Sequence, residues 1–164
     1  MTAPLLLGLP PIVGDGPRVL ILGNMPSVMS LAAQQYYANP RNAFWRITGE
    51  IFGFDAGAPY QARTAALRAR GVAVWDVLRL CRRQGSLDSA IEPDSMVAND
   101  FGTLFDAYPT IEQVYFNGAA AEKNFGRLVR GNRPLRCLRL PSTSPAQTMR
   151  YEDKLAAWRV VAAS

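Results

Sequence analysis

The polar residues of this chain that could do chemistry are amides and hydroxyls rather than histidines or metal ligands. Aromatic side chains stand close to them along the chain. Such a set suits an extruded nucleic-acid base, which proteins hold by stacking on a ring and read by amide hydrogen bonds at its edge. The amides and hydroxyls are Asn24, Asn42, Asn117, Ser142, Thr143 and Ser144, and the aromatic residues are Tyr36, Tyr37, Phe44 and Trp45.

The same groups could help to break the bond between a base and its sugar. That cleavage passes through an oxocarbenium-like state, and the departing base takes the electron pair. Backbone N–H groups, an asparagine amide or a helix N-terminus could stabilise the departing anion, and an asparagine carbonyl could position the attacking water. Each residue also has a structural interpretation. Tyr36, Phe44 and Trp45 could be core residues, and Asn39 could cap a helix.

Several other kinds of active site are excluded. The chain has no histidine, so it holds no Ser-His-Asp or Cys-His nucleophile and no histidine-ligated metal. Cys81 and Cys137 form no CxxC pair, and we expect buried thiols in a reducing compartment. The only GxG, at residues 14–16, precedes its predicted strand, so we expect no dinucleotide-binding loop. The chemistry outlined above requires neither a metal nor a cofactor, and we expect neither. For Asp76, capping a helix is at least as plausible as catalysis.

Composition indicates one globular domain over residues 1–164, with residues 1–16 as an extended N-terminal arm. The 164 residues are 49% hydrophobic and 19% charged, which is enough to build a core. A formal net charge of +5 favours a polyanionic partner such as DNA, although the arginines of residues 127–139 could simply be a solvated face. The apolar N-terminus lacks a basic segment and contains Pro10 and Pro11, so we expect a cytoplasmic protein without a signal peptide.

Short apolar runs alternate with helical patterns along the chain. This alternation predicts an α/β fold with a parallel sheet and helices on both faces. Ligands of such sheets bind beyond the carboxyl ends of the strands, where the polar segments of this chain lie. Asn39 is expected to cap the first helix and Asn99 the third. The expected strands are residues 18–22, 72–75, 113–116 and 136–140, and the expected helices are residues 41–52, 60–70, 99–107, 119–129 and 151–161.

The segment QQYYANPRNAFWRITGEIFGF, residues 34–54, resembles the uracil-DNA glycosylase superfamily, and within it most closely the hypoxanthine (deoxyinosine) DNA glycosylases. The resemblance implies a three-layer α/β/α sandwich with a central four-stranded parallel sheet. It also implies an enzyme of base excision repair that removes a flipped deaminated base, hypoxanthine above all, from single- or double-stranded DNA. The supporting strings are LILGNMPS (20–27), WDVL (75–78), RRQGSLDSAI (82–91), NDF (99–101), FNG (116–118) and LPSTSPA (140–146).

The resemblance also implies roles for single residues. Tyr37 would stack on the base, and Asn42 matches the asparagine on which hypoxanthine excision depends. The GNMPS string would wrap the base, while PSTSP would grip the phosphate backbone, with the wedge at Ala146 and Gln147. In full, the implied residues are Asn42 and Asn24 for catalysis, Tyr37, Met25, Pro26 and Asn117 for the base, and Ser27, Ser142, Thr143, Ser144, Ala146 and Gln147 for DNA.

Departures from the family pattern keep alternatives open. Mismatch-specific uracil enzymes have their catalytic asparagine where this chain has Met25, and Asn24 is one residue earlier. A uracil- or mismatch-directed glycosylase and a non-cleaving lesion-binding module are therefore alternatives, with a flavodoxin-like small-ligand domain last. A lyase would need an amine nucleophile, and we expect both lysines, Lys123 and Lys154, to lie away from the strand ends. We therefore expect a monofunctional glycosylase.

Overall fold

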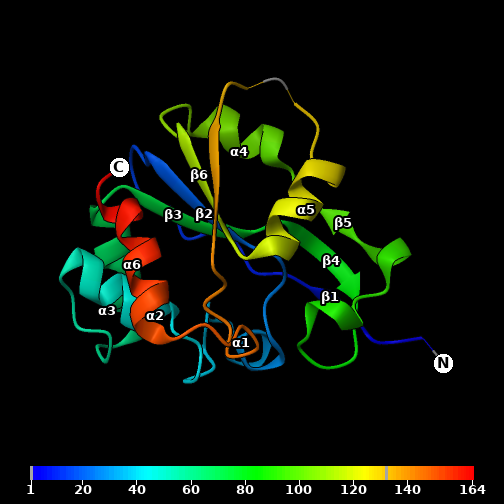
Figure 1. Ribbon diagram of the computed structural model, residues 1–164. Coiled ribbons are helices and arrows are strands. Elements are labelled where there is room, and N and C mark those ends of the chain that lie inside the picture. Colours follow the sequence, from blue (N-terminus) through cyan, green and yellow to red (C-terminus); the bar gives the residue numbers. More distant parts are fainter. Residues whose placement is uncertain (1, 132) are drawn as a thin grey trace.

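The computed structural model describes residues 2–131 and 133–164 and contains a central sheet of four parallel strands. The order across this sheet is β3-β2-β6-β7, as Figure 1 shows. Its two inner strands and β3 are apolar runs buried along nearly their whole length, as expected for parallel strands covered on both faces. The bounds are β2 (Val19–Gly23), β3 (Val72–Asp76), β6 (Gln113–Asn117) and β7 (Arg136–Leu140).

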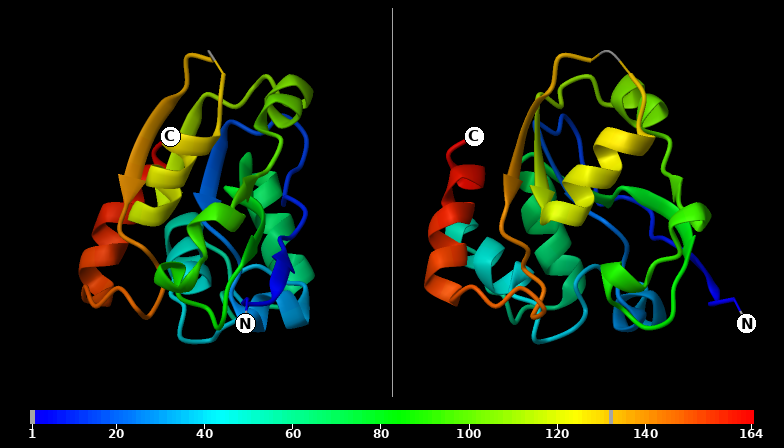
Figure 2. Two further views of the ribbon diagram at one scale, coloured as in Figure 1. Left: turned by 90° about the vertical axis from the view of Figure 1, so that its right-hand side faces the viewer. Right: turned by 45° about the vertical axis from the view of Figure 1, so that its right-hand side comes forward.

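Helices cover both faces of the sheet, which confirms the predicted three-layer α/β architecture (Figures 1 and 2). One layer contains α2 (Phe44–Phe52), α3 (Tyr60–Ala69) and α6 (Tyr151–Ala162). The other contains α4 (Phe101–Ala107) and α5 (Ala119–Leu128). Tyr36, Phe44 and Trp45 are buried in the hydrophobic core, in agreement with their structural interpretation. No helix among the described residues is long and apolar enough to span a membrane.

A second, antiparallel sheet lies beside α5 and was not expected from the sequence. Its strands β1 (Leu5–Leu7), β4 (Leu78–Arg82) and β5 (Val97–Ala98) have the order β1-β4-β5. Short 3-10 helices, η1 (Asp88–Ala90) and η2 (Pro93–Ser95), connect β4 to β5. The N-terminal arm thus contributes an edge strand here, and Ile12 pairs with Val74 of the central sheet. Met1, the first residue of the predicted arm, lies outside the described residues.

The helix expected from residue 41 begins instead at Phe44. The two asparagines before it hold the chain in a turn, because Asn39 Oδ1 accepts from the Arg41 N–H and Asn42 Oδ1 accepts from the Phe44 N–H, each at 2.9 Å. Such local side-chain bonds compete with helical hydrogen bonding. Asn39 is therefore not the N-cap, and Asn42 lies in the turn before α2.

Three further expectations were wrong in detail. Asp100, not Asn99, caps α4 by accepting from the Thr103 N–H, and Asn99 instead donates to the Asp76 carbonyl. The sequence patterns also missed α1 (Val28–Ala33), whose N-cap Ser27 accepts from the Ser30 N–H.

Both cysteines are free thiols, but only Cys81 is buried, because Cys137 lies on the exposed edge strand β7.

Candidate active site

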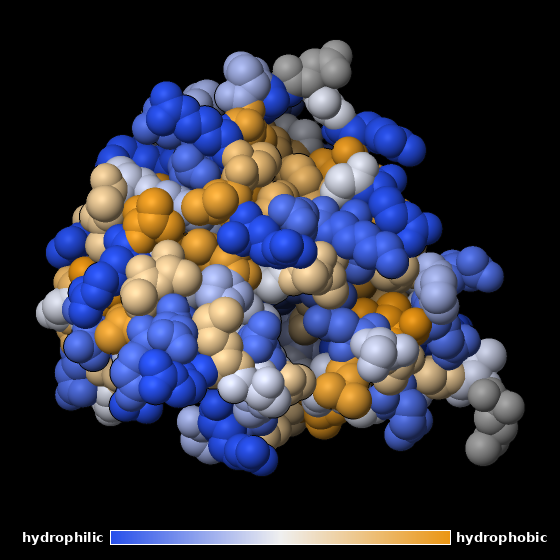
Figure 3. Space-filling view, in the orientation of Figure 1, coloured by the Kyte–Doolittle hydropathy of each residue, from blue (hydrophilic) through white to orange (hydrophobic). Residues whose placement is uncertain are grey.

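A cavity of about 200 Å³ opens at the carboxyl edge of the central sheet, and Figure 3 shows that face hollowed between α1 and the start of α5. Liquid water occupies roughly 30 Å³ per molecule, so the cavity has room for a group much larger than one water. Eleven of the predicted site residues line it, and Gln147 does not. They are Asn24, Met25, Pro26, Ser27, Tyr37, Asn42, Asn117, Ser142, Thr143, Ser144 and Ala146.

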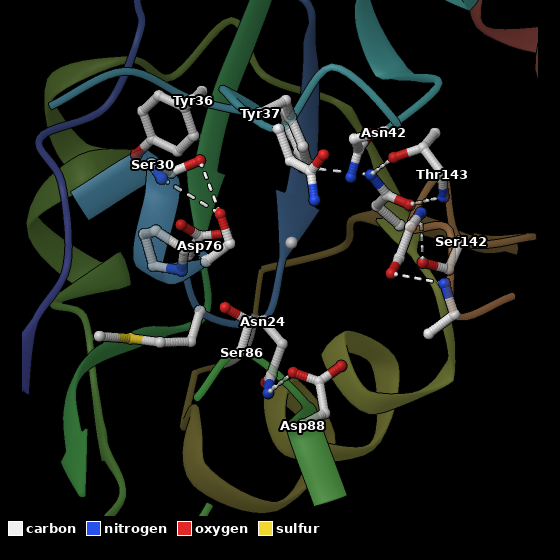
Figure 4. A pocket seen from close by; sticks show the side chains of 18 of the residues that line it. Asn24, Ser30, Tyr36, Tyr37, Asn42, Asp76, Ser86, Asp88, Ser142 and Thr143 are labelled. Carbon is white, nitrogen blue, oxygen red and sulfur yellow. Dashed lines mark hydrogen bonds between the residues drawn. The ribbon is translucent and has the colours of Figure 1, made fainter. Parts of the chain in front are cut away.

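Asn42 lines the cavity with a carboxamide that the protein holds at its oxygen end. The turn before α2 fixes the carboxamide, because Oδ1 accepts from the Phe44 N–H at 2.9 Å. Among the described residues no protein acceptor takes the Nδ2 hydrogens, so this end of the side chain remains for a ligand. Figure 4 shows Asn42 on the same side of the cavity as Ser142 and Thr143. An amide N–H held in this way is a preorganised donor.

Tyr37 lines the cavity with a ring that the protein holds firmly. One face of the ring stacks on Phe44, with centroids 4.0 Å apart and planes 17° apart. The Tyr37 hydroxyl accepts from Asn117 Nδ2 at 3.1 Å. Its backbone has φ of 54°, in the left-handed region that non-glycine residues seldom adopt. The strain and the stack together fix the ring where a planar ligand could lie against it.

Asn117 braces the cavity instead of presenting a free amide to it. Its Nδ2 donates to Tyr37 and to Thr143 Oγ1, at 3.1 and 3.0 Å. Its Oδ1 accepts from the Thr143 N–H at 2.9 Å. Both ends of the carboxamide are therefore engaged, and the buried Thr143 side chain is aimed inward rather than toward a phosphate. Through these bonds Asn117 and Thr143 connect Tyr37 to the loop of residues 141–147.

The loop of residues 141–147 is held by hydrogen bonds to its own serine hydroxyls and by a lysine of α6. Ser142 Oγ accepts from the Ser144 N–H and Ser144 Oγ accepts from the Ala146 N–H. Lys154, on α6, is buried and donates from Nζ to the carbonyls of Ser144 and Gln147, at 3.1 and 2.8 Å. The expectation that Lys154 lies away from the strand ends is thus wrong, although it does not line the cavity.

Asn24 is engaged on both sides of its carboxamide. Its Nδ2 donates to Asp88 Oδ1 at 3.0 Å, and its Oδ1 accepts from Asn124 Nδ2 of α5 at 2.8 Å. The carbonyl oxygen that would orient a water already accepts this one hydrogen bond, which fixes the direction of the carboxamide. Arg83 supports the same wall of the cavity, because its guanidinium donates to the Pro26 carbonyl at 2.7 Å.

Asp76, the last residue of β3, is a buried carboxyl in the wall of the cavity. It is 4% exposed, and its Oδ2 has no hydrogen-bond partner among the described residues. Burial raises the pKa of this carboxyl to about 7, and the negative charge of Asp88 adds to the effect, while Arg83 opposes it. Burial likewise raises the pKa of Tyr37, so that phenol is neutral beside it.

The raised pKa of Asp76 predicts a pH-dependent stability that Asp76→Asn removes. An acid whose pKa is higher in the folded than in the unfolded state stabilises the fold at low pH. That contribution is complete below about pH 4, where the unfolded group is also protonated, and is lost as pH rises through 7. At roughly 1.4 kcal/mol per pKa unit, the free energy of unfolding of Asp76→Asn relative to the wild type should rise by on the order of 4 kcal/mol between pH 4 and pH 8. Urea unfolding of both proteins at both pH values measures this change. A difference between the two proteins that is the same at pH 4 and pH 8 would contradict the prediction.

The family model described as "Uracil DNA glycosylase superfamily" matches residues 10–163 of this chain. The chain belongs to the uracil-DNA glycosylase superfamily. The match spans the four central strands and all the residues that line the cavity.

Relatives within the superfamily are similar along most of the chain. A hypoxanthine DNA glycosylase from Methanosarcina barkeri is 38% identical over 112 residues, 68% of this chain and 70% of the relative. One from Methanosarcina acetivorans is 33% identical over 155 residues, 94% of this chain and 96% of the relative. A solution NMR structure of a candidate uracil DNA glycosylase from Methanosarcina acetivorans superposes with a TM-score of 0.83 at 32% identity, covering 97% of each chain.

This member of the superfamily also has cavity residues that residue patterns did not single out. Ser30 lines the cavity from α1, and Ser86, Leu87 and Asp88 line it from the loop after β4. The last three lie inside the RRQGSLDSAI string, so the resemblance carried a signal for them. Asn124 does not line the cavity but supports it through Asn24, and no sequence signal pointed to it. It is a polar residue inside a helical pattern, and only the packing of α5 brings it to Asn24.

Proposed function

We propose that this protein is a monofunctional DNA glycosylase that hydrolyses the N-glycosidic bond of a flipped deaminated base, most of all hypoxanthine. The observation that carries the proposal is the joint placement of a held aromatic ring, Tyr37, and a free amide donor, Asn42, in one cavity. The relatives named as hypoxanthine DNA glycosylases support the same substrate.

In the proposed reaction the extruded purine lies against Tyr37 and is held by stacking. The bond from C1′ of the sugar to the purine breaks, and its electron pair moves into the ring system. Asn42 Nδ2 donates to the base as negative charge develops there, so its hydrogen bond is strongest in the transition state. Water then adds to C1′ and leaves an abasic site. Ser142 and Ser144, on the loop of residues 141–147, would contact the DNA backbone, which the net charge of +5 attracts.

Uracil excision is the weaker proposal on this scaffold. It would need Asn24 to orient a water, which is the role that the resemblance implies for the polar side chain of this motif. Both ends of that carboxamide are bonded to Asp88 and Asn124. We therefore expect excision of uracil to be much slower than that of hypoxanthine.

A panel of oligonucleotides with one modified base each tests the proposed function. Single- and double-stranded DNA containing deoxyinosine, deoxyuridine or deoxyxanthosine is incubated with the protein and then treated with alkali, which breaks the strand at an abasic site. The deoxyinosine strand should break. Salt-sensitive binding without breakage of any strand would favour the lesion-binding module instead.

Borohydride should trap no covalent complex between the protein and DNA. A bifunctional lyase forms a Schiff base with an amine, and such an amine must reach C1′. Lys123 is exposed on α5, and Lys154 is bonded to two carbonyls beneath the loop. Gel analysis of the enzyme with deoxyinosine DNA and borohydride checks this point. A trapped adduct that disappears in Lys154→Ala would show that the loop releases this lysine during turnover.

A further inference from the structure

We propose that Asp76 is a further catalytic residue, a neutral carboxyl that donates its proton to the departing purine. This inference rests on the proposed function. Asp76 pairs with Gly23 in the sheet, so its side chain lies at the carboxyl edge where the cavity begins. Figure 4 shows it across the cavity from Asn42. The unpartnered Oδ2 is a polar atom that the fold has buried without satisfying it, which is costly unless a ligand completes it.

The charges around Asp76 favour its neutral form. Asp88, from the loop after β4, adds negative charge, and Tyr36 and Tyr37, from the loop before α2, are phenols that burial keeps neutral by raising the pKa of each. Arg83 is the opposing cation, and its effect is smaller than those of burial and Asp88; its guanidinium donates to the carbonyls of Gly85 and Pro26, while its Nη1 has no partner among the described residues. A carboxyl kept neutral in this way can donate a hydrogen bond or a proton near neutral pH.

The proposed step balances without any further reagent. As the bond between C1′ and the purine breaks, the electron pair goes to the purine and the Asp76 proton moves to an acceptor atom of that ring. Water adds to C1′, and its lost proton passes to solvent. Asp76, now ionised, regains a proton from solvent once the base has left.

The test is the pH dependence of single-turnover hypoxanthine excision between pH 5 and 9. For the wild type, the rate should be level below about pH 7 and fall roughly tenfold per pH unit above it, because the protonated form is lost. Asp76→Asn keeps the shape but has no carboxyl proton. It should slow excision roughly hundredfold at pH 6 and remove the fall above pH 7. Asp15→Asn, the same change in an exposed turn before β2, should keep the wild-type profile.

The outcomes are distinguishable. A wild-type rate that rises through pH 7 would show that the ionised carboxyl is needed and would overturn the proposal, whether or not Asp76→Asn folds. An Asp76→Asn profile identical to the wild type would overturn it as well, while leaving the glycosylase itself intact. A wild type with no activity on any modified base, although folded and able to bind DNA, would overturn the proposed function and this step with it.

Discussion

Asn42→Ala should lower the single-turnover rate of hypoxanthine excision by roughly 10²–10³-fold, the loss expected when one preorganised donor to a developing anion is removed. Asn42 lines the cavity, and its bond from the Phe44 N–H fixes the orientation of the carboxamide. The substitution also deletes that bond before α2, which should cost about 1 kcal/mol of unfolding free energy. Stopped or quenched reactions on deoxyinosine DNA measure the rate.

Asn42→Asp separates the catalytic role of this side chain from its structural one. It keeps an oxygen that can accept from the Phe44 N–H, but it replaces the amide donor with a negative charge beside the departing base. Thermal stability should therefore stay close to the wild type while excision is lost. Wild-type excision by either variant would contradict the assignment of Asn42 as the donor.

Gly23→Ala should distort the cavity without removing any group that lines it. A Cβ on Gly23 would lie 2.4 Å from Asp76 Oδ1 and 3.0 Å from the Tyr37 hydroxyl, so the Asp76 and Tyr37 side chains, which both line the cavity, would have to shift. We expect a loss of about 2–3 kcal/mol in unfolding free energy, within the range for overpacking. Excision should fall by about a hundredfold, because displacement of a held ring by even 1 Å spoils alignment.

Gly126→Ala is the matched control for this substitution. Gly126 lies on α5, and a Cβ there would meet nothing within 4 Å. Alanine is the better helix former, so this variant should be more stable by up to about 1 kcal/mol and as active as the wild type. If Gly23→Ala matched this control in stability and rate, the expectation that close packing at Gly23 is needed for stability and excision would be wrong.

The strands and the edge that carries the site could be predicted from sequence because apolar runs of parallel strands are continuous and polar residues follow each run. The strands at residues 72–76 and 136–140 are where the pattern placed them, to within one residue. The second sheet could not be predicted in this way. β4 alternates in a short arginine-containing run, and β1 becomes a strand only by pairing with it.

The roles of the site residues were harder to predict from sequence than the position of the site. Asn24 and Asn117 lie at the cavity as expected, but sequence cannot show that Asn124 and Thr143, distant along the chain, occupy their hydrogen-bonding groups. Asp76 illustrates the converse. An acid after a strand is an ordinary helix cap in sequence, and only burial without a partner distinguishes it.

Direct detection of the released base tests the central claim most simply. Wild-type protein is incubated with DNA containing a single deoxyinosine, and the products are analysed by mass spectrometry without alkali. The protein should release free hypoxanthine in an amount equal to that of a strand with one intact abasic site. Intact deoxyinosine DNA after prolonged incubation with folded, DNA-bound protein would contradict it.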